Sequence, residues 1–450
     1  MEMICPIAQA HGDNADQVFI LTPDLSLTFA RFDDYVQDCC GQIRAMGFAP
    51  GSRVMVKADR SWQTLALLFA LFRSGHVAVP VDPDSPQARL QDLQRQIAAV
   101  AVLDQDFMAP ISSSVSATDV GVDVLHPCLG IFTSGSTGVP KLVMHSLATL
   151  LANARSANAI IPLAGSARTL LSLPLYHIGG IAQVLRAALS ATALVIGSRV
   201  EASEQLNEWR VTHASMVSTQ LQRLLAQQLS TPFLQAVLLG GGPCPETLLQ
   251  MAKARNLPIW QTYGMSETAS QLVMIDPQGQ MQVSAGNEFH ISADQELWIR
   301  GDSLFLGYWS EQGIDSARDD QGWFHSGDLA VLSEGRLEII GRKDNQFVSG
   351  GKNVQPEEIE RQLQRLNDVR RAVVVPVAHV EFGQIPFAFV ELQPFLQCTP
   401  AWQQQTIDLL KTRLPGYLVP RRFTLLPAET GLKPRRPILQ QMAQALMSSL

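Results

Sequence analysis

The stretch that decides the fold reads Thr133-Ser134-Gly135-Ser136-Thr137-Gly138-Val139-Pro140-Lys141. The apolar run Leu129–Phe132 comes directly before it and predicts a buried strand. Gly135 and Gly138 free the backbone to turn its N–H groups toward one point, and the Ser and Thr hydroxyls add further donors. Phosphate oxygens suit such a concavity, with Lys141 as a nearby positive charge. The stretch therefore predicts a strand that leads into a phosphate-binding loop.

This loop differs from a Walker A loop. Its glycines are three residues apart rather than five, Pro140 precedes the lysine, and Leu142 stands where a Walker A loop carries its magnesium-binding Ser or Thr. The alternative interpretation is a flexible Gly/Ser linker. The strand before the loop and the Pro-Lys pair after it favour phosphate binding.

Around this loop, short apolar runs alternate with helical patterns over most of the chain, which predicts a largely parallel α/β sheet. Ligands of such sheets bind at the carboxyl ends of the strands. Gly240, Gly241 and Gly242 follow one predicted strand and Tyr263-Gly264 follows another, so we expect both segments to line a ligand site. The predicted strands are Val77–Val81, Thr169–Leu173, Ala193–Gly197, Ala214–Ser218, Leu234–Leu239 and Pro258–Thr262, and the predicted helices are Trp62–Arg73, Ser146–Ile160, Leu206–Arg210 and Thr219–Gln228.

The pattern changes after Gly286 to short alternating strands, and it changes again after Arg342–Asp344. There Pro356-Glu357-Glu358 opens a helix with a proline and two acids in its first turn, where missing hydrogen bonds and the helix dipole favour them. Strands at Arg371–Val377 and Phe387–Leu392 and a helix near Trp402–Arg413 follow. We predict a large domain at residues 1–341 and a small α+β domain at residues 342–450.

Composition excludes several classes of protein. The 450 residues are 46% hydrophobic and 17% charged, as in an ordinary globular protein with a large core. A formal charge of -7 argues against a nucleic-acid binder but not against a small anionic ligand. The cysteines are scattered, Met1–Ala10 has no cationic leader, and the longest apolar run, Leu65–Phe72, is far shorter than a bilayer span. We expect a cytoplasmic protein with free thiols and no membrane insertion. Whether it forms a homo-oligomer stays an open question.

Several motifs that follow one another in a fixed order carry a family resemblance. They resemble the adenylate-forming superfamily of acyl-CoA synthetases, adenylation domains and firefly-type luciferases over nearly the whole chain. The resemblance implies a large N-terminal domain with parallel α/β sheets and a distorted β-barrel-like part, and a small mobile α+β C-terminal domain. The motifs are Val79-Pro80-Val81-Asp82-Pro83, Thr133–Lys141, Leu173-Pro174-Leu175-Tyr176-His177, Tyr263-Gly264-Met265-Ser266-Glu267, Gly322-Trp323-Phe324-His325-Ser326-Gly327-Asp328, Gly341-Arg342-Lys343-Asp344 and Gly350-Gly351 with Pro356–Glu360.

The same resemblance implies that a carboxylate oxygen attacks the α-phosphorus of ATP and expels pyrophosphate. Glu267 would hold Mg²⁺, and Asp328, assisted by Arg342, would accept hydrogen bonds from the ribose hydroxyls. Taken alone, Asp328 is more typical of a turn after Gly327, and the motif context reverses this. Glu267 is also typical of a helix N-terminus, a role that could coexist with metal binding. The other residues implied in ATP binding are Thr133, Ser134, Gly135, Ser136, Thr137, Gly138, Lys141, Gly240, Gly241, Gly242, Tyr263, Gly264 and Ser266.

Three further roles follow from the resemblance. Lys433 is the candidate for the lysine that reaches the α-phosphate, but Gly431-Leu432-Lys433-Pro434-Arg435-Arg436 is one residue wider than the usual Gly-Lys-x-x-Arg. A neighbouring cation, or a solvated basic tail, stays an alternative. Asp344 would be the hinge of the small domain. His177 would orient the second step, although a lone histidine after Pro-Leu-Tyr is more often packed in a core.

The acceptor and the acid are also indicated by resemblance. Gly350-Gly351-Lys352-Asn353-Val354 resembles the Gly-Gly-Glu-Asn-Ile form of CoA ligases, with Lys where Glu is usual, which implies coenzyme A. Segments such as His213–Leu225 and Lys343–Glu360 resemble the o-succinylbenzoate–CoA ligases of menaquinone biosynthesis. A dicarboxylic acid needs a cation that binds the carboxylate that does not react, and Arg223 is the candidate. The alternative interpretation is that Arg223 is an ordinary arginine on a helix surface. Ser218 and Thr219 would contribute to a semi-polar pocket.

The expected function is thus an ATP-, Mg²⁺- and CoA-dependent ligase for a small carboxylic acid. Another aryl- or acyl-CoA synthetase is the nearest alternative. A luciferase-like oxidoreductase and a non-catalytic binding protein are more distant ones. The retained phosphate loop, Glu267, Asp328 and Lys433 disfavour the non-catalytic protein.

Overall fold

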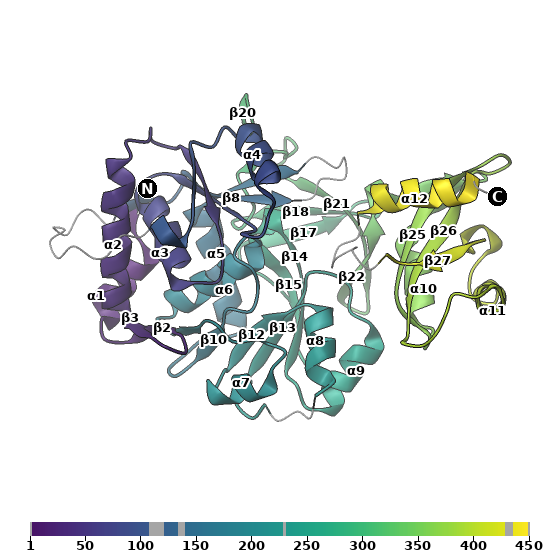
Figure 1. Ribbon diagram of the computed structural model, residues 1–450, viewed down its shortest axis with the longest axis horizontal. Coiled ribbons are helices and arrows are strands. Elements are labelled where there is room, and N and C mark those ends of the chain that lie inside the picture. The colour runs from purple at the N-terminus through teal and green to yellow at the C-terminus, as the bar shows by residue number, and fades with distance from the viewer. Residues whose placement is uncertain (1, 108–120, 134–139, 228–230, 428–434, 449–450) are drawn as a thin grey trace. The chain divides into compact units, whose positions relative to one another are not determined.

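A computed structural model describes residues 2–107, 121–133, 140–227, 231–427 and 435–448. The chain forms two compact units (Figure 1): the first comprises Met1–Phe289 and Ile299–Phe324, and the second His290–Trp298 and His325–Leu450. The second unit therefore takes in more of the chain than the predicted small domain, and the domain boundary at Arg342–Asp344 stays a prediction. None of the described helices has the length and apolar composition needed to cross a bilayer.

A nine-stranded mixed sheet lies in the first unit. Its central strands are parallel, whereas the edge pairs β14–β15, β15–β16 and β2–β3 are antiparallel. Strands alternate with helices along this part of the chain, as predicted. In sheet order the strands are β16 (Met281–Val283), β15 (Ser270–Ile275), β14 (Ile259–Met265), β13 (Ala236–Leu239), β12 (His213–Met216), β10 (Arg168–Leu170), β11 (Ala193–Val195), β2 (Val18–Leu21) and β3 (Ser26–Thr28).

A second mixed sheet of seven strands carries the predicted phosphate loop. Strands β4, β5, β6 and β8 pair in parallel, and β8, β9, β19 and β20 pair antiparallel. In sheet order the strands are β20 (Gly313–Asp315), β19 (Gly307–Ser310), β9 (Lys141–Ser146), β8 (Pro127–Thr133), β5 (Val77–Val81), β4 (Arg53–Lys57) and β6 (Ala101–Leu103). A separate pair joins β1 (Glu2–Ile4) to β7 (Gly121–Asp123).

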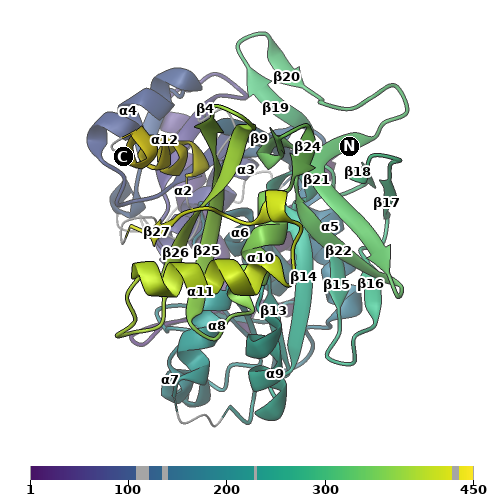
Figure 2. The same cartoon turned by 90° about the vertical axis from the view of Figure 1, so that its right-hand side faces the viewer.

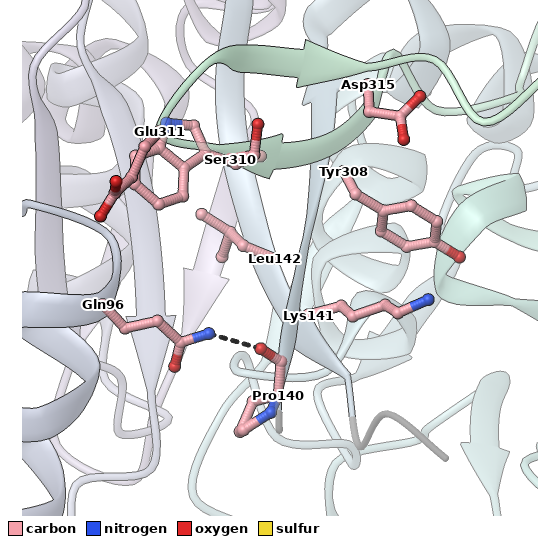
Figure 3. A pocket seen from close by; sticks show the side chains of 9 residues that line it. Gln96, Pro140, Lys141, Leu142, Tyr308, Ser310, Glu311 and Asp315 are labelled. Atoms are coloured by element: carbon pink, nitrogen blue, oxygen red, sulfur yellow. Dashed lines mark hydrogen bonds between the residues drawn. The ribbon is translucent and has the colours of Figure 1, made fainter. Parts of the chain in front are cut away.

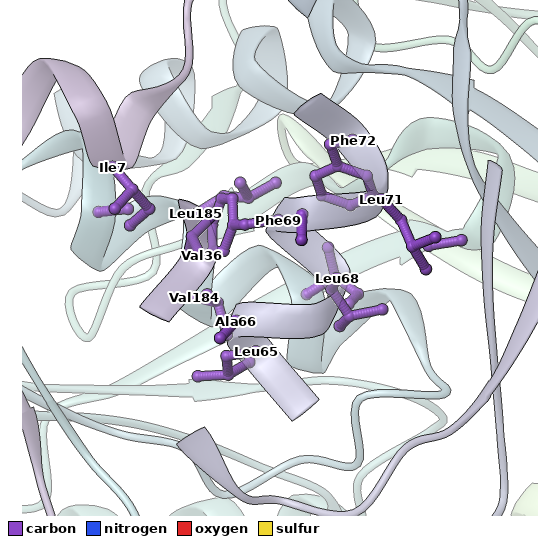
Figure 4. Close-up of a cluster of buried hydrophobic side chains, with 14 of the residues drawn as sticks. Ile7, Val36, Leu65, Ala66, Leu68, Phe69, Leu71, Phe72, Val184 and Leu185 are labelled. Atoms are coloured by element: carbon purple, nitrogen blue, oxygen red, sulfur yellow. The ribbon is translucent and has the colours of Figure 1, made fainter. Parts of the chain in front are cut away.

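Helices of the first unit bury one large apolar core. Leu65 and Phe69 of α3 pack in the same cluster as Val36 of α2 and Leu185 of α6 (Figure 4). The Oγ of Ser61 accepts a hydrogen bond from the backbone N–H of Thr64, which caps α3 at its first turn. The helices are α1 (Pro6–Asn14), α2 (Phe29–Ala45), α3 (Trp62–Arg73), α4 (Gln87–Gln96), α5 (Leu147–Ile160), α6 (Ile178–Leu189), α7 (Ser203–Glu208), α8 (Ser218–Leu225) and α9 (Glu246–Ala254).

The second unit contains a five-stranded sheet and parts of a four-stranded sheet, and its helices α10 (Pro356–Gln364), α11 (Pro400–Lys411) and α12 (Arg436–Ser448) pack against the five-stranded one (Figure 2). Alternate residues of its longest strand face opposite sides: Val374 packs with α10 and α11, and Val375 packs with α12. The five-stranded sheet comprises β24 (Lys352–Val354), β23 (Phe347–Ser349), β26 (Gly383–Leu392), β25 (Val369–His379) and β27 (Phe423–Leu425); the four-stranded sheet comprises β17 (Asn287–Ile291), β18 (Glu296–Gly301), β21 (Phe324–Ser333) and β22 (Arg336–Arg342).

The structure confirms the α/β class and shifts several element ends. Val77–Val81 and Trp62–Arg73 have the predicted bounds. The strand predicted at Pro258–Thr262 instead continues through Tyr263 and Gly264 to Met265, because this end pairs antiparallel with β15. The short strands predicted after Gly286 include those of the four-stranded sheet, and a distorted β-barrel-like part stays a prediction.

Candidate functional site

The predicted phosphate loop connects two neighbouring antiparallel strands. Thr133 ends β8, Lys141 begins β9, and these two residues form the last pair of the ladder. The Nε2 of Gln96 donates a hydrogen bond of 2.6 Å to the carbonyl oxygen of Pro140, so the end of the loop is also fixed to α4. Both ends of the loop are therefore fixed, by the β8–β9 pairing and by the hydrogen bond to α4. Ser134, Gly135, Ser136, Thr137 and Gly138 lie outside the described residues.

Lys141, Tyr308 and Glu267 come together from three distant segments of the first unit. Strand β19 pairs with β9, with Tyr308 opposite Val143, and this pairing brings the phenol beside the loop lysine. The Nζ of Lys141 lies 4.7 Å from the ring centroid of Tyr308 (Figure 3). The Oη of Tyr308 donates a hydrogen bond of 2.8 Å to Oε1 of Glu267. A cation and an oriented carboxylate therefore lie at the root of the loop.

Lys141 and Tyr308 also line an open pocket of about 400 Å³. Figure 3 shows the hairpin of β19 and β20 along one side of it, with Glu311 and Asp315 on that hairpin. Pro140 and Lys141, at the end of the loop, line this pocket, so it belongs to the surroundings of the loop.

Hydrogen bonds from two side chains to backbone carbonyls hold the short turn that carries Glu267, the 3₁₀ segment Ser266–Thr268. The Nε2 of buried His145 lies 2.7 Å from the carbonyl oxygen of Ser266, and Nδ2 of Asn153 donates to the carbonyl oxygen of Thr268 at 3.1 Å. Burial lowers the pKa of His145 to about 4, so its ring is neutral at pH 7 and Nε2 carries the proton that this bond needs. His145 and Asn153 thus position the turn of Glu267.

Close packing explains the glycine in the Tyr263-Gly264 segment. A Cβ on Gly264 would lie 1.7 Å from the carbonyl oxygen of Ser270, in the neighbouring strand β15. Tyr263 and Gly264 therefore belong to a strand with an irregular register rather than to an open loop. Ser266 follows in the turn and its backbone carbonyl is held by His145.

The loops after β12 and β13 lie side by side at the carboxyl ends of two neighbouring parallel strands. The Oγ of Ser218 donates to the carbonyl oxygen of Pro243 at 3.1 Å. A Cβ on Gly240 would lie 2.4 Å from Oγ1 of Thr262, and Gly241 has a φ of 82°. Gly240, Gly241 and Gly242 are thus next to Ser218, as expected for a ligand-binding edge, whereas Thr219 is exposed.

His177 lies at the start of α6. It is exposed, and its ring centroid is 4.8 Å from that of Tyr176. The turn before it is tight, because a Cβ on Gly180 would lie 2.2 Å from the carbonyl oxygen of Pro174. The expectation that a histidine in this motif is more often packed in a core does not apply here. Its role in the second step stays a prediction.

A buried arginine on α6 was missed by the sequence reasoning. The Nε of Arg186 donates to Oδ1 of Asn158 at 2.8 Å, and its Nη2 donates to the carbonyl oxygen of Ile161 at 2.9 Å. Within the described parts of the chain, no carboxylate forms an ion pair with it. Burial lowers the pKa of Arg186 to about 10, and burial together with this neighbouring charge lowers the pKa of His213 to about 4. A single arginine among the apolar residues of this helix was the signal in the sequence.

Arg223, the predicted partner of the second carboxylate, has a different environment. It lies on α8 with 70% of its side chain exposed, and its Nη1 is 3.5 Å from Oε1 of Glu201. On the same helix as Arg186, Gln183 is buried: its Nε2 donates to Oγ of Ser172, which in turn donates to the carbonyl oxygen of Ser215. The role of Arg223 stays a prediction.

In the second unit, Arg342 joins two predicted site residues. Its Nη1 donates to Oδ1 of Asp328 at 3.0 Å, while Nε and Nη2 donate to the two oxygens of Asp344 at 3.1 and 3.2 Å. Burial lowers the pKa of Arg342, but the hydrogen bonds and negative charges of Asp344 and Asp328 raise this pKa by a larger amount, so its net change is upward. A Cβ on Gly327 would lie 3.0 Å from Nη2 of Arg342. The guanidinium thus orients the Asp328 carboxylate.

The other predicted residues of this unit lie in a hairpin. Gly350 and Gly351 have φ angles of 54° and 78° at the turn between β23 and β24, a conformation that favours glycine. The Nζ of Lys352 lies 4.8 Å from the ring centroid of Tyr417. Their role toward coenzyme A stays a prediction. Lys433 lies outside the described residues.

Known proteins resemble this chain over most of its length. The family model described as AMP-binding enzyme matches residues 7–309, and that described as AMP-binding enzyme C-terminal domain matches residues 358–431. Relatives named 2-succinylbenzoate–CoA ligase are 32% identical over 432 residues in Salmonella typhimurium (93% of both chains) and 32% over 426 residues in Escherichia coli (91% of both).

Solved structures share the fold. Wild-type E. coli MenE with a bound m-phenylether-linked analogue of OSB-AMS is 29% identical with a TM-score of 0.82, covering 98% of this chain and 99% of that one. The o-succinylbenzoate CoA synthetase of Bacillus subtilis, in complex with the acyl-adenylate intermediate OSB-AMP, is 23% identical with a TM-score of 0.88, covering 98% of each.

Proposed function

Because the chain belongs to the family of AMP-binding enzymes, we propose that it is an ATP-dependent acid–CoA ligase whose acid is 2-succinylbenzoate. The relatives that are 32% identical carry that name, and they match nearly the whole of the chain. The observation that carries the proposal in the structure is the set Lys141, Tyr308 and Glu267 at the root of the Thr133–Lys141 loop.

The reaction has two steps. First, a carboxylate oxygen of the acid attacks the α-phosphorus of ATP, and the bond from that phosphorus to pyrophosphate breaks. Then the sulfur of coenzyme A attacks the acyl carbon of the adenylate, AMP leaves, and the thiol proton passes to solvent. Preorganised donors and cations lower the barrier of the first step because charge is spread over phosphate oxygens. Lys141 and the backbone of its loop supply such groups in this proposal.

Magnesium fits the carboxylate of Glu267. This ion keeps several waters and is usually bound by one or two carboxylates together with substrate phosphates. Glu267 is half-buried and one of its oxygens receives the Tyr308 hydroxyl, which fixes its orientation and leaves lone pairs for an ion. When bound there, the ion would neutralise charge on the phosphate oxygens.

The second unit would bind the ribose. Asp328 has 11% of its side chain exposed and is oriented by Arg342. An oriented acid is the group that accepts hydrogen bonds from ribose hydroxyls in other nucleotide sites. The proposal keeps Lys433 as the cation for the α-phosphate, Asp344 as the hinge, and Gly350, Gly351 and Lys352 on the face that meets coenzyme A.

Arg186 supports a dicarboxylic acid. Its side chain is buried and hydrogen-bonded only to neutral groups among the described residues. A buried cation without a counter-ion is costly, so an anionic ligand would stabilise it. The carboxylate of 2-succinylbenzoate that does not react supplies such an anion.

Two matched arginine variants test this assignment. We expect Arg186→Met to lower kcat/KM for 2-succinylbenzoate by roughly 30-fold or more, because truncation of one partner of a buried charge pair costs about 2 kcal/mol or more. Benzoate, which lacks the second carboxylate, should be affected little. Arg223→Met should leave 2-succinylbenzoate within about threefold, since exposed ion pairs contribute little.

CoA-dependent AMP release with the two acids is the measurement. If wild-type protein used benzoate as well as 2-succinylbenzoate, the acid would be wrong and another aryl- or acyl-CoA synthetase would be indicated. If Arg223→Met showed the selective loss and Arg186→Met did not, the assignment of the arginine would be wrong.

A further inference from the structure

Asn158 of α5 is hydrogen-bonded to both the side chain and the backbone of Arg186 on α6. Its Oδ1 accepts a hydrogen bond of 2.8 Å from Nε of Arg186, and its Nδ2 donates to the backbone carbonyl oxygen of the same residue at 3.0 Å. Nδ2 also donates to Oγ of Ser190 at 2.9 Å. Since a carbonyl oxygen can only accept, the bond to the backbone of Arg186 fixes the orientation of the amide. Asn158 therefore presents its oxygen to the guanidinium.

The bonds of Arg186 leave one of its nitrogens for another partner. Asn158 accepts from Nε, and the carbonyl oxygen of Ile161 accepts from Nη2 at 2.9 Å, whereas no hydrogen bond among the described residues uses Nη1. Both acceptors lie at the end of α5, since Ile161 directly follows this helix. The guanidinium is planar and rigid, so it cannot turn without losing these two bonds. The end of α5 therefore sets the direction in which Nη1 points.

Both acceptors are electrically neutral. Arg186 is buried, with 5% of its surface exposed, and no carboxylate in the described parts of the chain pairs with it. An aspartate at position 158 would accept the same bond from Nε, but its charge would also neutralise the guanidinium. A buried cation that already has a counter-ion attracts a second anion much less. The amide of Asn158 thus orients the cation and leaves its charge uncompensated.

We infer that Asn158 is the positioning residue that makes Arg186 selective for an acid with two carboxylates. Its neutral oxygen holds Nε, so Nη1 and the full charge of the guanidinium stay free for the carboxylate that does not react. Asn158 acts on the acid through Arg186. This inference rests on the proposed function, in which Arg186 binds that carboxylate.

Acid-dependent exchange of labelled pyrophosphate into ATP follows adenylation alone, and its constants separate this role from a general loss of structure. The carboxylate that does not react is bound alike in the ground state and in the transition state, so a weakened Arg186 raises the KM for 2-succinylbenzoate without lowering kcat. We expect Asn158→Ala to raise this KM about tenfold, because the guanidinium loses the acceptor that orients it. Asn158→Asp should raise it about 30-fold or more, as Arg186→Met does, because the new carboxylate competes with that of the acid. In both Asn158 variants, kcat and the KM for ATP should stay within about threefold of wild type.

Two controls complete the test. Asn256→Asp adds the same charge at an exposed position after α9, where the left-handed backbone, with a φ of 53°, accepts either residue, and it should leave every constant unchanged. In the Arg186→Met background, Asn158→Ala should raise the KM for the acid no further, because the residue through which Asn158 acts is gone.

Three results would overturn the inference: a wild-type KM for the acid in Asn158→Asp, a change of the same factor in kcat or in the KM for ATP, or a further rise of the KM when Asn158→Ala is added to Arg186→Met. Thermal unfolding checks that each variant folds, and if Asn158→Asp does not, Asn158→Ala and the double variant decide. Failure of the proposed function is distinguishable, because wild-type protein would then show no exchange with 2-succinylbenzoate, or Arg186→Met would keep the wild-type KM.

Discussion

Tyr308 links the loop lysine to the carboxylate that would hold magnesium, and Tyr308→Phe removes the hydroxyl that makes this link. The variant deletes the Oη that donates to Glu267 over 2.8 Å. It keeps the aromatic ring, 4.7 Å from the Nζ of Lys141, and with it the cation–π contact. The effect of the substitution on magnesium dependence therefore reports on the orientation of Glu267.

The expected magnitude follows from that one bond. A hydrogen bond to a charged group contributes about 1.5–3 kcal/mol, and each 1.36 kcal/mol corresponds to a factor of ten. Loss of partners that orient metal ligands typically weakens metal affinity about 10- to 100-fold. Glu267 is half-buried, so water replaces part of the lost bond. We expect the Mg²⁺ concentration for half-maximal pyrophosphate exchange to rise about tenfold in Tyr308→Phe.

The assay is a magnesium titration of pyrophosphate exchange at constant MgATP. Tyr35→Phe is the matched control, because Tyr35 lies on α2 and packs against Trp62, 4.5 Å between ring centroids. The reasoning would be refuted if Tyr308→Phe and Tyr35→Phe gave the same magnesium curve as wild type. Loss of folding in Tyr308→Phe is checked by thermal unfolding of both variants.

Other predictions concern stability and the turn of Glu267. Arg73→Met breaks the buried ion pair with Asp33 and should lower the free energy of unfolding, measured by denaturant titration, by about 3 kcal/mol or more. The double variant Arg73→Met/Asp33→Leu leaves no unpaired charge, so it should recover much of the lost free energy of unfolding. The pKa of His145 is lowered to about 4, so on acidification the ring takes up a proton in the unfolded chain before it does so in the folded one. We therefore expect the free energy of unfolding to carry the full contribution of His145 above about pH 6.5 and to lose roughly 3 kcal/mol of it toward pH 4. The melting temperature of His145→Gln should depend less on pH. Gly264→Ala would place a Cβ 1.7 Å from the Ser270 carbonyl oxygen. We expect it to lower the free energy of unfolding by about 2 kcal/mol or more and to abolish pyrophosphate exchange. Normal pyrophosphate exchange would contradict the close packing at Gly264.

Local patterns predicted the elements whose ends are decided by their own residues. The apolar run within Trp62–Arg73 is capped by Ser61, and both ends of α3 were predicted correctly. The strand predicted at Thr169–Leu173 is shorter, since β10 ends at Leu170 and the chain then turns toward Pro174. The end of β14 depends on pairing with β15, and this long-range contact leaves no local signal.

The site shows the same limit. Motifs identified Lys141, Glu267 and Asp328, because each lies in a contiguous signature. Tyr308 lies in no such signature, and its place beside Lys141 depends on the pairing of β19 with β9. Arg186 was visible only as one charge in an apolar helix, and the absence of an acidic partner among the described residues is a property of the folded chain.

Product analysis tests the central claim most directly. Purified protein is mixed with ATP, Mg²⁺, coenzyme A and 2-succinylbenzoate, and nucleotides, pyrophosphate and thioester are quantified together. The proposed function predicts AMP, pyrophosphate and 2-succinylbenzoyl-CoA in equal amounts, with none formed when the acid is left out. Formation of ADP in place of AMP, or AMP release without a thioester, would contradict it.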